Sequence, residues 1–171
     1  VEGGNGELPR LAVRTNHGTA EVYFQGAHIT SWHPASTRDP VLWMSGKSLF
    51  EAGTPIRGGV PICFPWFGAR SGDAAAPPHG FARLRNWTLV GAAEDAAGTV
   101  TVEFELAGKA VSPYWPHRFA IRHRLSIGAV LRMELAVSNP GTEPFTFEEA
   151  LHSYFAVGDV REVTVAGLER T

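Results

Sequence analysis

Hydrophobic and polar residues alternate over several short stretches of the chain. In residues 100–106, Val, Phe and Leu side chains alternate with Thr and Glu. Residues 119–127 and 131–137 show the same period of two, and residues 20–25 and 87–90 are shorter segments of similar character. A period of two is typical of a strand that buries one face and leaves the other in water. The pattern therefore predicts a chain built mainly of short strands, six or more in all.

Turn-forming residues separate these segments. Asn and Gly bracket a turn at residues 16–18, and Gly follows Ser or Ala at residues 45–46 and 97–98. Residues 139–141 read Asn-Pro-Gly, and the small, Pro-rich residues 71–78 predict an exposed loop. No long stripe of apolar residues at helical spacing and no internal repeat occurs. The predicted fold class is therefore all-β, an antiparallel sandwich or barrel.

Composition and charge exclude several classes of protein. The chain has 171 residues and a formal net charge of -2, which predicts a single domain over residues 1–171. A near-neutral balance argues against a nucleic-acid partner or an anionic membrane. No apolar run approaches the roughly 20 residues that a membrane helix needs, and no signal segment opens the chain. With Cys63 alone, no internal disulfide can form. We therefore expect a cytoplasmic protein, of undetermined oligomeric state.

The stretch GGVPICFPWFG, residues 58–68, interrupts the regular pattern. Its two prolines remove backbone donors and favour an irregular segment over a regular strand. The surrounding residues 50–86 concentrate arginine, histidine and aromatic side chains. Such a cluster predicts either aromatic core filling with solvated arginines or a site for a small anionic ligand. The members of the cluster are Arg57, Arg70, His79, Arg83 and Arg85, with Phe64, Trp66, Phe67 and Phe81.

A second concentrated stretch is FTFEEALHSYF, residues 145–155. In an extended segment, Glu148, His152 and Tyr154 share one face. A histidine can act as an acid or a base near neutral pH. The alternative interpretation is a buried structural histidine bonded to a carbonyl or a carboxylate.

Several other chemistries lack their sequence signatures. The chain has no HExxH motif, no paired CxxC, no GxSxG elbow and no phosphate-binding loop. Neither His28 with His33 nor His117 with His123 has metal-ligand spacing. Cys63 lies between Ile62 and Phe64, and an apolar setting predicts a buried, unreactive thiol. We therefore expect no metal and no cofactor.

Three motifs together resemble the aldose 1-epimerase superfamily, and within it the glucose-6-phosphate 1-epimerase (hexose-6-phosphate mutarotase) family. They are PIRGGVPICFPWFG (residues 55–68), HGFARLRNW (79–87) and EEALHSYFAVGDV (148–160), and QGAHITSW (25–32) fits an early strand pair. The resemblance covers nearly the whole chain. It implies a large galactose mutarotase-like β-sandwich, of which these residues form the N-terminal part.

The resemblance also implies roles for four residues. His152 matches the general acid of the family, and Arg57 and Arg83 match two arginines that contact the substrate. His79 matches a histidine that contacts sugar hydroxyls. Pro78 stands where family members often have a polar residue, so any contact from that side chain is absent here.

The implied reaction exchanges the anomers of a hexose 6-phosphate, with glucose 6-phosphate as the expected substrate. An acid protonates the ring oxygen and a base removes the proton of the anomeric hydroxyl, which needs no cofactor. Family members continue beyond the point that matches Thr171, and their base is a glutamate in that later part. We therefore expect the domain to be incomplete at the C-terminus, with open strand edges.

Three other functions fit the sequence. One is a carbohydrate-binding β-sandwich without catalytic activity, because fold alone does not distinguish the two. Another is an epimerase that acts on free sugars, against which the two arginines argue. The third is a structural or interaction protein, which would show no response to sugars.

Overall fold

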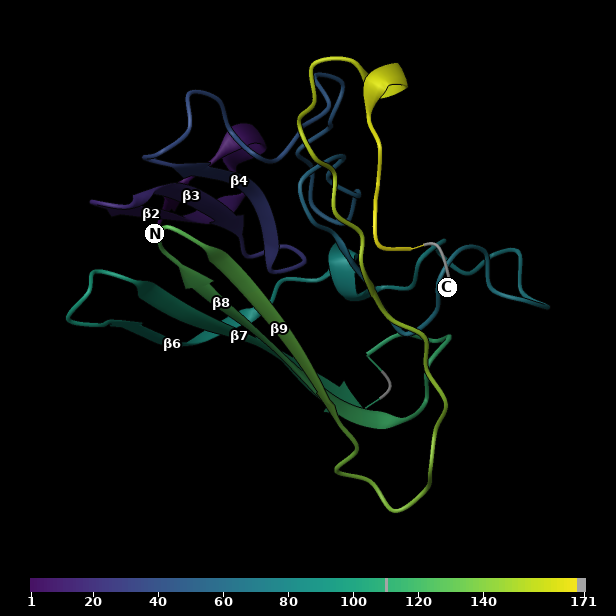
Figure 1. The fold of residues 1–171 in the computed structure, drawn as a ribbon. Helices are drawn as coiled ribbons and strands as arrows, with labels where there is room; N and C mark the ends of the chain where they lie inside the picture. Colours follow the sequence, from purple (N-terminus) through teal and green to yellow (C-terminus); the bar gives the residue numbers. More distant parts are fainter. Residues whose placement is uncertain (110, 169–171) are drawn as a thin grey trace.

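The computed structural model describes residues 1–109 and 111–168 and places them in two facing antiparallel sheets (Figure 1). The strand order is β1-β2-β3-β4 in the first sheet and β6-β7-β8-β9 in the second, and β10 pairs with β5. The strands are β1 (Glu2–Gly3), β2 (Pro9–Thr15), β3 (Gly18–Tyr23), β4 (His28–Pro34), β5 (Ile62–Cys63), β6 (Thr88–Glu94), β7 (Val100–Lys109), β8 (Arg118–Ile127), β9 (Leu131–Ser138) and β10 (Ala150–Leu151).

This architecture confirms the predicted all-β, antiparallel fold class. The strands expected from alternation at residues 100–106, 119–127 and 131–137 are β7, β8 and β9. The described helical segments are three-residue 3₁₀ turns: η1 (Asn5–Glu7), η2 (Ala82–Leu84) and η3 (Val160–Glu162). None of these described helices is long or apolar enough to cross a membrane.

Two parts of the pattern differ from the prediction. Strand β2 was not predicted, because Leu11 and Val13 are its only large apolar residues. In the stretch 145–155, only β10 belongs to a regular strand pair. The segment is extended, but Pro61 and Pro65 opposite it have no N–H to return a hydrogen bond.

The main hydrophobic core lies between the two sheets. Val22 of β3, Phe104 of β7 and Ile121 of β8 are fully buried members of the same cluster. The opposite face of the second sheet is charged, since Arg122 bonds to Glu103 and Glu105 on β7. Exposed pairs of this kind add little stability, so burial of the inner faces holds the sheets together.

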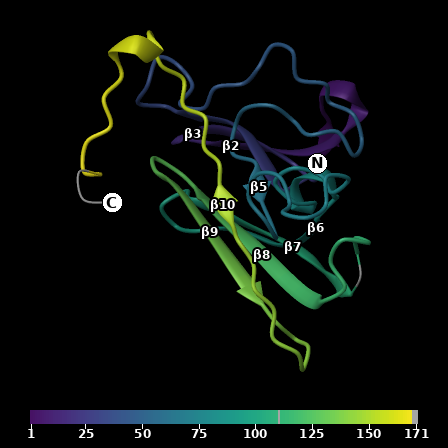
Figure 2. The same cartoon turned by 90° about the vertical axis from the view of Figure 1, so that its right-hand side faces the viewer.

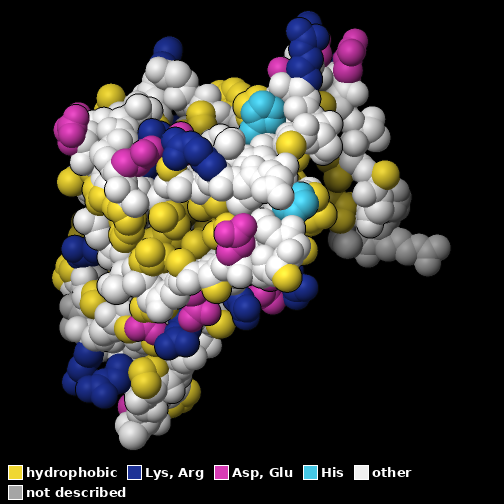
Figure 3. All heavy atoms as spheres, turned by 90° about the vertical axis from the view of Figure 1, so that its left-hand side faces the viewer, with side chains coloured by type: hydrophobic (Ala, Val, Ile, Leu, Met, Phe, Trp, Pro, Cys, Tyr) yellow, Lys and Arg dark blue, Asp and Glu magenta, His cyan; other side chains and the backbone are white. Residues whose placement is uncertain are grey.

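The described strands do not enclose the core on every side. Figure 3 shows a band of hydrophobic side chains on one face, with charged side chains above and below it. On the side shown in Figure 2, the segment after β9 returns past the second sheet, and β10 lies beside β5. Beyond Ala156 the chain leaves the sheets, and Val160 and Val165 are more than two-thirds exposed.

Candidate active site

The candidate site lies along a ladder that is longer than β5 and β10. Backbone N–H groups of residues 148, 152 and 154 donate to the carbonyl oxygens of Pro65, Pro61 and Gly59, at 3.1, 3.1 and 2.9 Å. Cys63 pairs with Ala150 between them. Residues 148–154 therefore run antiparallel to residues 59–65, with side chains of alternate residues on one face.

The two prolines and the first two glycines of GGVPICFPWFG have identifiable structural roles. The prolines stand where only a carbonyl acceptor is used, so the ladder tolerates them. Gly59 has a φ of +61°, and a Cβ there would lie 2.3 Å from the carbonyl oxygen of Ile29. Gly58 has a φ of +106° and passes close to the Trp43 carbonyl oxygen. Glycine is therefore required at both positions, where the segment passes close to the backbones of Ile29 in β4 and of Trp43.

His152 lies at the accessible end of this ladder. Its backbone is bonded to Pro61, and its side chain is half-buried. The imidazole is 6.1 Å from the His79 ring, centroid to centroid, at an interplanar angle of 77°. The fold thus brings together two predicted site residues that are 73 positions apart in the chain. The interpretation of His152 as a buried structural histidine does not fit this environment.

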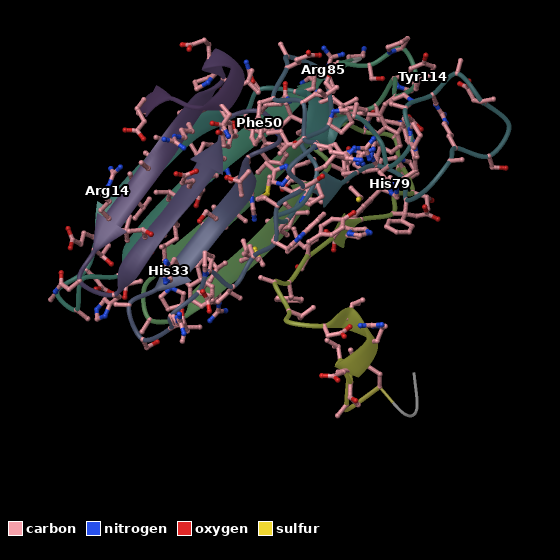
Figure 4. All side chains as sticks on the ribbon, turned by 90° about the horizontal axis from the view of Figure 1, so that it is seen from above. Arg14, His33, Phe50, His79, Arg85 and Tyr114 are labelled. Atoms are coloured by element: carbon pink, nitrogen blue, oxygen red, sulfur yellow. The ribbon has the colours of Figure 1, made fainter. Side chains whose placement is uncertain are left out.

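His79 is held by a turn that Gly68 closes. The backbone N–H of His79 donates to the Gly68 carbonyl oxygen at 2.7 Å, and the Gly68 N–H donates to Nδ1 of His79 at 3.1 Å. His79 has a φ of +63°, which is rare for a residue with a Cβ. Burial, followed by the charges of Arg83, His152 and Arg57, lowers the pKa of His79. Figure 4 shows His79 at the opposite end of the molecule from Arg14 and His33.

Arg83 is the buried cation of the group: only 8% of its surface is exposed, and its charge acts on His79. Its Nη2 donates to the carbonyl oxygen of Pro78 at 2.6 Å. Burial lowers the pKa of the Arg83 guanidinium, and the nearby Cys63 thiol partly offsets this effect. Nε of Arg83 is buried without a described partner. Pro78 therefore contacts Arg83 through its backbone.

Arg57 is the exposed cation of the group. Its backbone N–H donates to Oγ of Ser48 at 2.9 Å, and its carbonyl oxygen accepts from Ser45 N–H at 3.0 Å. The side chain is exposed to solvent. Its charge acts on both Arg83 and His79. The four predicted site residues therefore form one cationic cluster, with Arg83 below and Arg57 at the surface.

The other members of the predicted cluster serve the structure of the loops. Arg70 donates to the carbonyl oxygen of Tyr114 at 2.5 Å, and its guanidinium carbon lies 5.0 Å from the Trp66 ring centroid. Arg85 donates to the Val111 carbonyl oxygen. Among the aromatic residues, Phe64, Trp66 and Phe81 are core residues, whereas Phe67 is 48% exposed. Aromatic core filling therefore describes Phe64, Trp66 and Phe81, and a site for a small anionic ligand stays a prediction.

Phe67 was predicted only as a member of the aromatic cluster and Tyr154 only as sharing a face with His152, so neither residue was assigned a role of its own. The Phe67 ring lies 4.8 Å from His79 and 6.1 Å from His152, and the Tyr154 ring lies 4.8 Å from His152, centroid to centroid. Only their positions in the motifs FPWFG and HSYF could have indicated them. The backbone N–H of Phe67 donates to Oε2 of Glu148 at 2.8 Å. Glu148 therefore positions the Phe67 backbone.

Two other histidines are buried structural histidines, the role that was the alternative interpretation of His152. His28 and His123 are fully buried, and each has one ring nitrogen bonded to a backbone carbonyl oxygen. Burial lowers the pKa of each to about 4. Both therefore belong to the core as neutral side chains. Cys63 is likewise buried, and burial raises the pKa of its thiol, as predicted.

Fold and site together define an all-β protein with a cationic, histidine-containing site suited to a small anionic ligand. A family model described as aldose 1-epimerase matches residues 9–171. The chain therefore belongs to the aldose 1-epimerase family.

Curated relatives agree with this assignment. The chain is 43% identical over 150 residues to a Salmonella typhimurium protein named "Putative glucose-6-phosphate 1-epimerase", covering 87% of this chain and 49% of that protein. An Escherichia coli protein of the same name is 40% identical over 163 residues, which cover 95% of this chain and 53% of the relative. The chain thus spans about half the length of the curated relatives it matches.

Solved structures show the same fold. A crystal structure described as a "putative mutarotase" from Salmonella typhimurium matches with a TM-score of 0.83 at 39% identity, covering 91% of this chain and 51% of that one. A protein from Synechocystis matches with a TM-score of 0.65 at 20% identity, covering 78% and 50%, which supports the fold alone. The expected mutarotase-like β-sandwich is therefore confirmed.

Proposed function

We propose that this protein interconverts the α and β anomers of a hexose 6-phosphate, with glucose 6-phosphate as the expected substrate. The observation that carries the proposal is the pair His79 and His152, 6.1 Å apart and beside Arg57 and Arg83. The names of the two bacterial relatives support the choice of substrate. Arginine provides charge-assisted hydrogen bonds of the kind that a phosphate accepts.

In the proposed mechanism, His152 donates a proton to the ring oxygen while a base removes the proton of the anomeric hydroxyl. The C1–O5 bond breaks to give the open-chain aldehyde. Rotation about C1–C2 and reclosure, with the two proton transfers reversed, produce the other anomer. The base is proposed to be a glutamate beyond Thr171, as the resemblance to the family implies.

The remaining residues bind the substrate. Arg57, exposed and cationic, is placed to bind the 6-phosphate. His79 accepts a bond at Nδ1, so Nε2–H is available to donate to a sugar hydroxyl. Arg83 is largely buried and contributes its positive charge to the site from within the protein. No metal or cofactor enters this mechanism, and a cytoplasmic location stays a prediction.

The test is anomer exchange of glucose 6-phosphate, measured by NMR saturation transfer in weak buffer. This chain and the complete product of its reading frame are compared, with free glucose as the second substrate. The proposal predicts acceleration for the phosphate ester and a much smaller effect on free glucose. Equal acceleration of both would indicate an epimerase for free sugars. Binding without acceleration by either protein would indicate a carbohydrate-binding domain and contradict the proposal.

A further inference from the structure

Within the part of the chain that the structure describes, no hydrogen bond orients the His152 ring. Among residues 1–109 and 111–168, the hydrogen bond of His152 is that of its backbone N–H to Pro61. In contrast, each of the described histidines His28, His79 and His123 has a ring nitrogen bonded to a backbone group. A proton-donating histidine must nevertheless present a nitrogen in a defined direction, because misplaced groups lose much of their catalytic effect.

Two aromatic rings lie nearly parallel to the His152 imidazole. The Phe67 ring makes an interplanar angle of 13° with it at 6.1 Å, and the Tyr154 ring makes an angle of 26° at 4.8 Å. Phe67 is bonded to Glu148, four residues before His152, whereas Tyr154 follows His152 by two residues. Phe67 therefore reaches the imidazole from the loop that is bonded to Glu148, whereas Tyr154 belongs to the same extended segment as His152.

Both residues are held through their backbones. The N–H of Tyr154 donates to the Gly59 carbonyl oxygen at 2.9 Å, and its carbonyl oxygen accepts from Trp43 N–H at 3.0 Å. The Trp43 ring lies 6.0 Å from the Tyr154 ring. On the other side, Glu148 holds the Phe67 backbone at 2.8 Å. The stack thus rests on backbone bonds at both ends.

We propose that Phe67 and Tyr154 form an aromatic clamp that orients His152 by stacking. Ring stacking contributes about as much as a single hydrogen bond, so it can replace the bond that a histidine usually makes to a carbonyl or carboxylate. The clamp leaves both imidazole nitrogens free for the substrate. Aromatic faces also accept a cationic ring, so the clamp holds in both protonation states. Phe67 and Tyr154 are positioning residues, and the inference rests on the proposed function of His152.

The test combines a spectroscopic readout with kinetics on Tyr154→Leu, Tyr154→Phe and Phe67→Leu. The imidazole proton resonances of His152 are identified by their loss in His152→Ala. Stacked rings shift such resonances upfield, so they should move downfield in Tyr154→Leu and in Phe67→Leu and stay in place in Tyr154→Phe. Phe67 is half exposed, so Phe67→Leu should still fold. Its His152 resonances can therefore be measured even if Tyr154→Leu does not fold. Tyr114→Leu, which removes a half-buried tyrosine away from His152, is the matched control.

In the complete product of the reading frame, kcat for anomer exchange should fall about tenfold or more in Tyr154→Leu with little change in KM. Tyr154→Phe should retain wild-type kcat. Unchanged His152 resonances in both leucine variants would overturn the clamp. Absence of exchange in the wild type would instead contradict the proposed function, and the resonance shifts alone would then decide whether the clamp exists.

Discussion

His79 and Gly68 are joined by two hydrogen bonds, one from His79 N–H to the Gly68 carbonyl oxygen and one from Gly68 N–H to His79 Nδ1. A backbone N–H can only donate, so Nδ1 must be the acceptor and the neutral ring carries its proton on Nε2. Surrounding cations and burial lower the pKa of His79, in agreement with a neutral ring.

We therefore predict that His79 is neutral at pH 7, with a titration midpoint below the usual 6.5. Two-bond ¹H–¹⁵N correlation spectra should show an unprotonated Nδ1 and a protonated Nε2. His79→Ala identifies the signals. A proton on Nδ1 at neutral pH would show that the bond to Gly68 does not exist in solution.

Arg57→Ala should raise the dissociation constant for a hexose 6-phosphate about 10- to 100-fold, because a charge-assisted hydrogen bond is lost. Binding of the free hexose should change little. Calorimetry with glucose 6-phosphate and glucose measures both. Arg124→Ala, on the outer face of β8, removes an equal charge far from the site and should leave both affinities unchanged. Equal losses for the two sugars would remove Arg57 from the phosphate site.

Gly80 and Gly72 form a matched pair for a test of the loop around His79. Their φ angles are similar, +73° and +76°. A Cβ on Gly80 would lie 1.9 Å from the Phe64 carbonyl oxygen. A Cβ on Gly72 would have no atom within 4 Å. Gly72→Ala should cost about 1 kcal/mol from the left-handed conformation alone. Gly80→Ala should cost at least about 2 kcal/mol more, because the backbone must move. Urea unfolding measures both, and equal costs would contradict this packing.

His28 and His123 should make the free energy of unfolding depend on pH. Each has a folded-state pKa of about 4, against 6.5 when exposed. Below pH 6.5 the unfolded chain binds protons that the folded chain does not take up until about pH 4. Stability is therefore lost as the pH falls through this window, by about 2 kcal/mol per histidine at pH 5.

Urea unfolding at pH 7 and pH 5 measures this effect. In the wild type, the free energy of unfolding should differ between pH 7 and pH 5. His123→Leu should reduce this difference by about half of the contribution of the two histidines, whatever its effect on absolute stability. His33→Gln, at a partly exposed histidine of β4, should keep the wild-type difference. A His123→Leu variant with an unchanged pH difference would show that His123 is not buried and neutral.

The sequence predicts the second sheet well because β7, β8 and β9 each bury one face and expose the other. Alternation is a local property, so it can be read without knowledge of the strand partners. The ladder between residues 59–65 and 148–154 is different. Its register depends on contacts between segments about 90 residues apart, and Pro61 and Pro65 conceal it locally.

Prediction of the site was also limited to local signals, because contacts between distant segments cannot be read from the sequence. His152, Arg57, His79 and Arg83 were identified by their motifs, and the structure brings them together. The burial of Arg83 could not be predicted, because it depends on the Pro78 carbonyl oxygen as a partner. The stacking of Phe67 and Tyr154 on His152 is equally a product of the tertiary fold.

The most direct test of the central claim is the rate of anomer exchange of glucose 6-phosphate with His152→Ala, in the complete product of the reading frame. His117→Ala is the matched control, since it removes a half-buried histidine that contacts Trp115 and Phe145. We predict that the wild type and His117→Ala accelerate exchange and that His152→Ala reduces the acceleration by about 100-fold or more. Acceleration by His152→Ala at the wild-type rate would contradict the assignment of His152 as the acid.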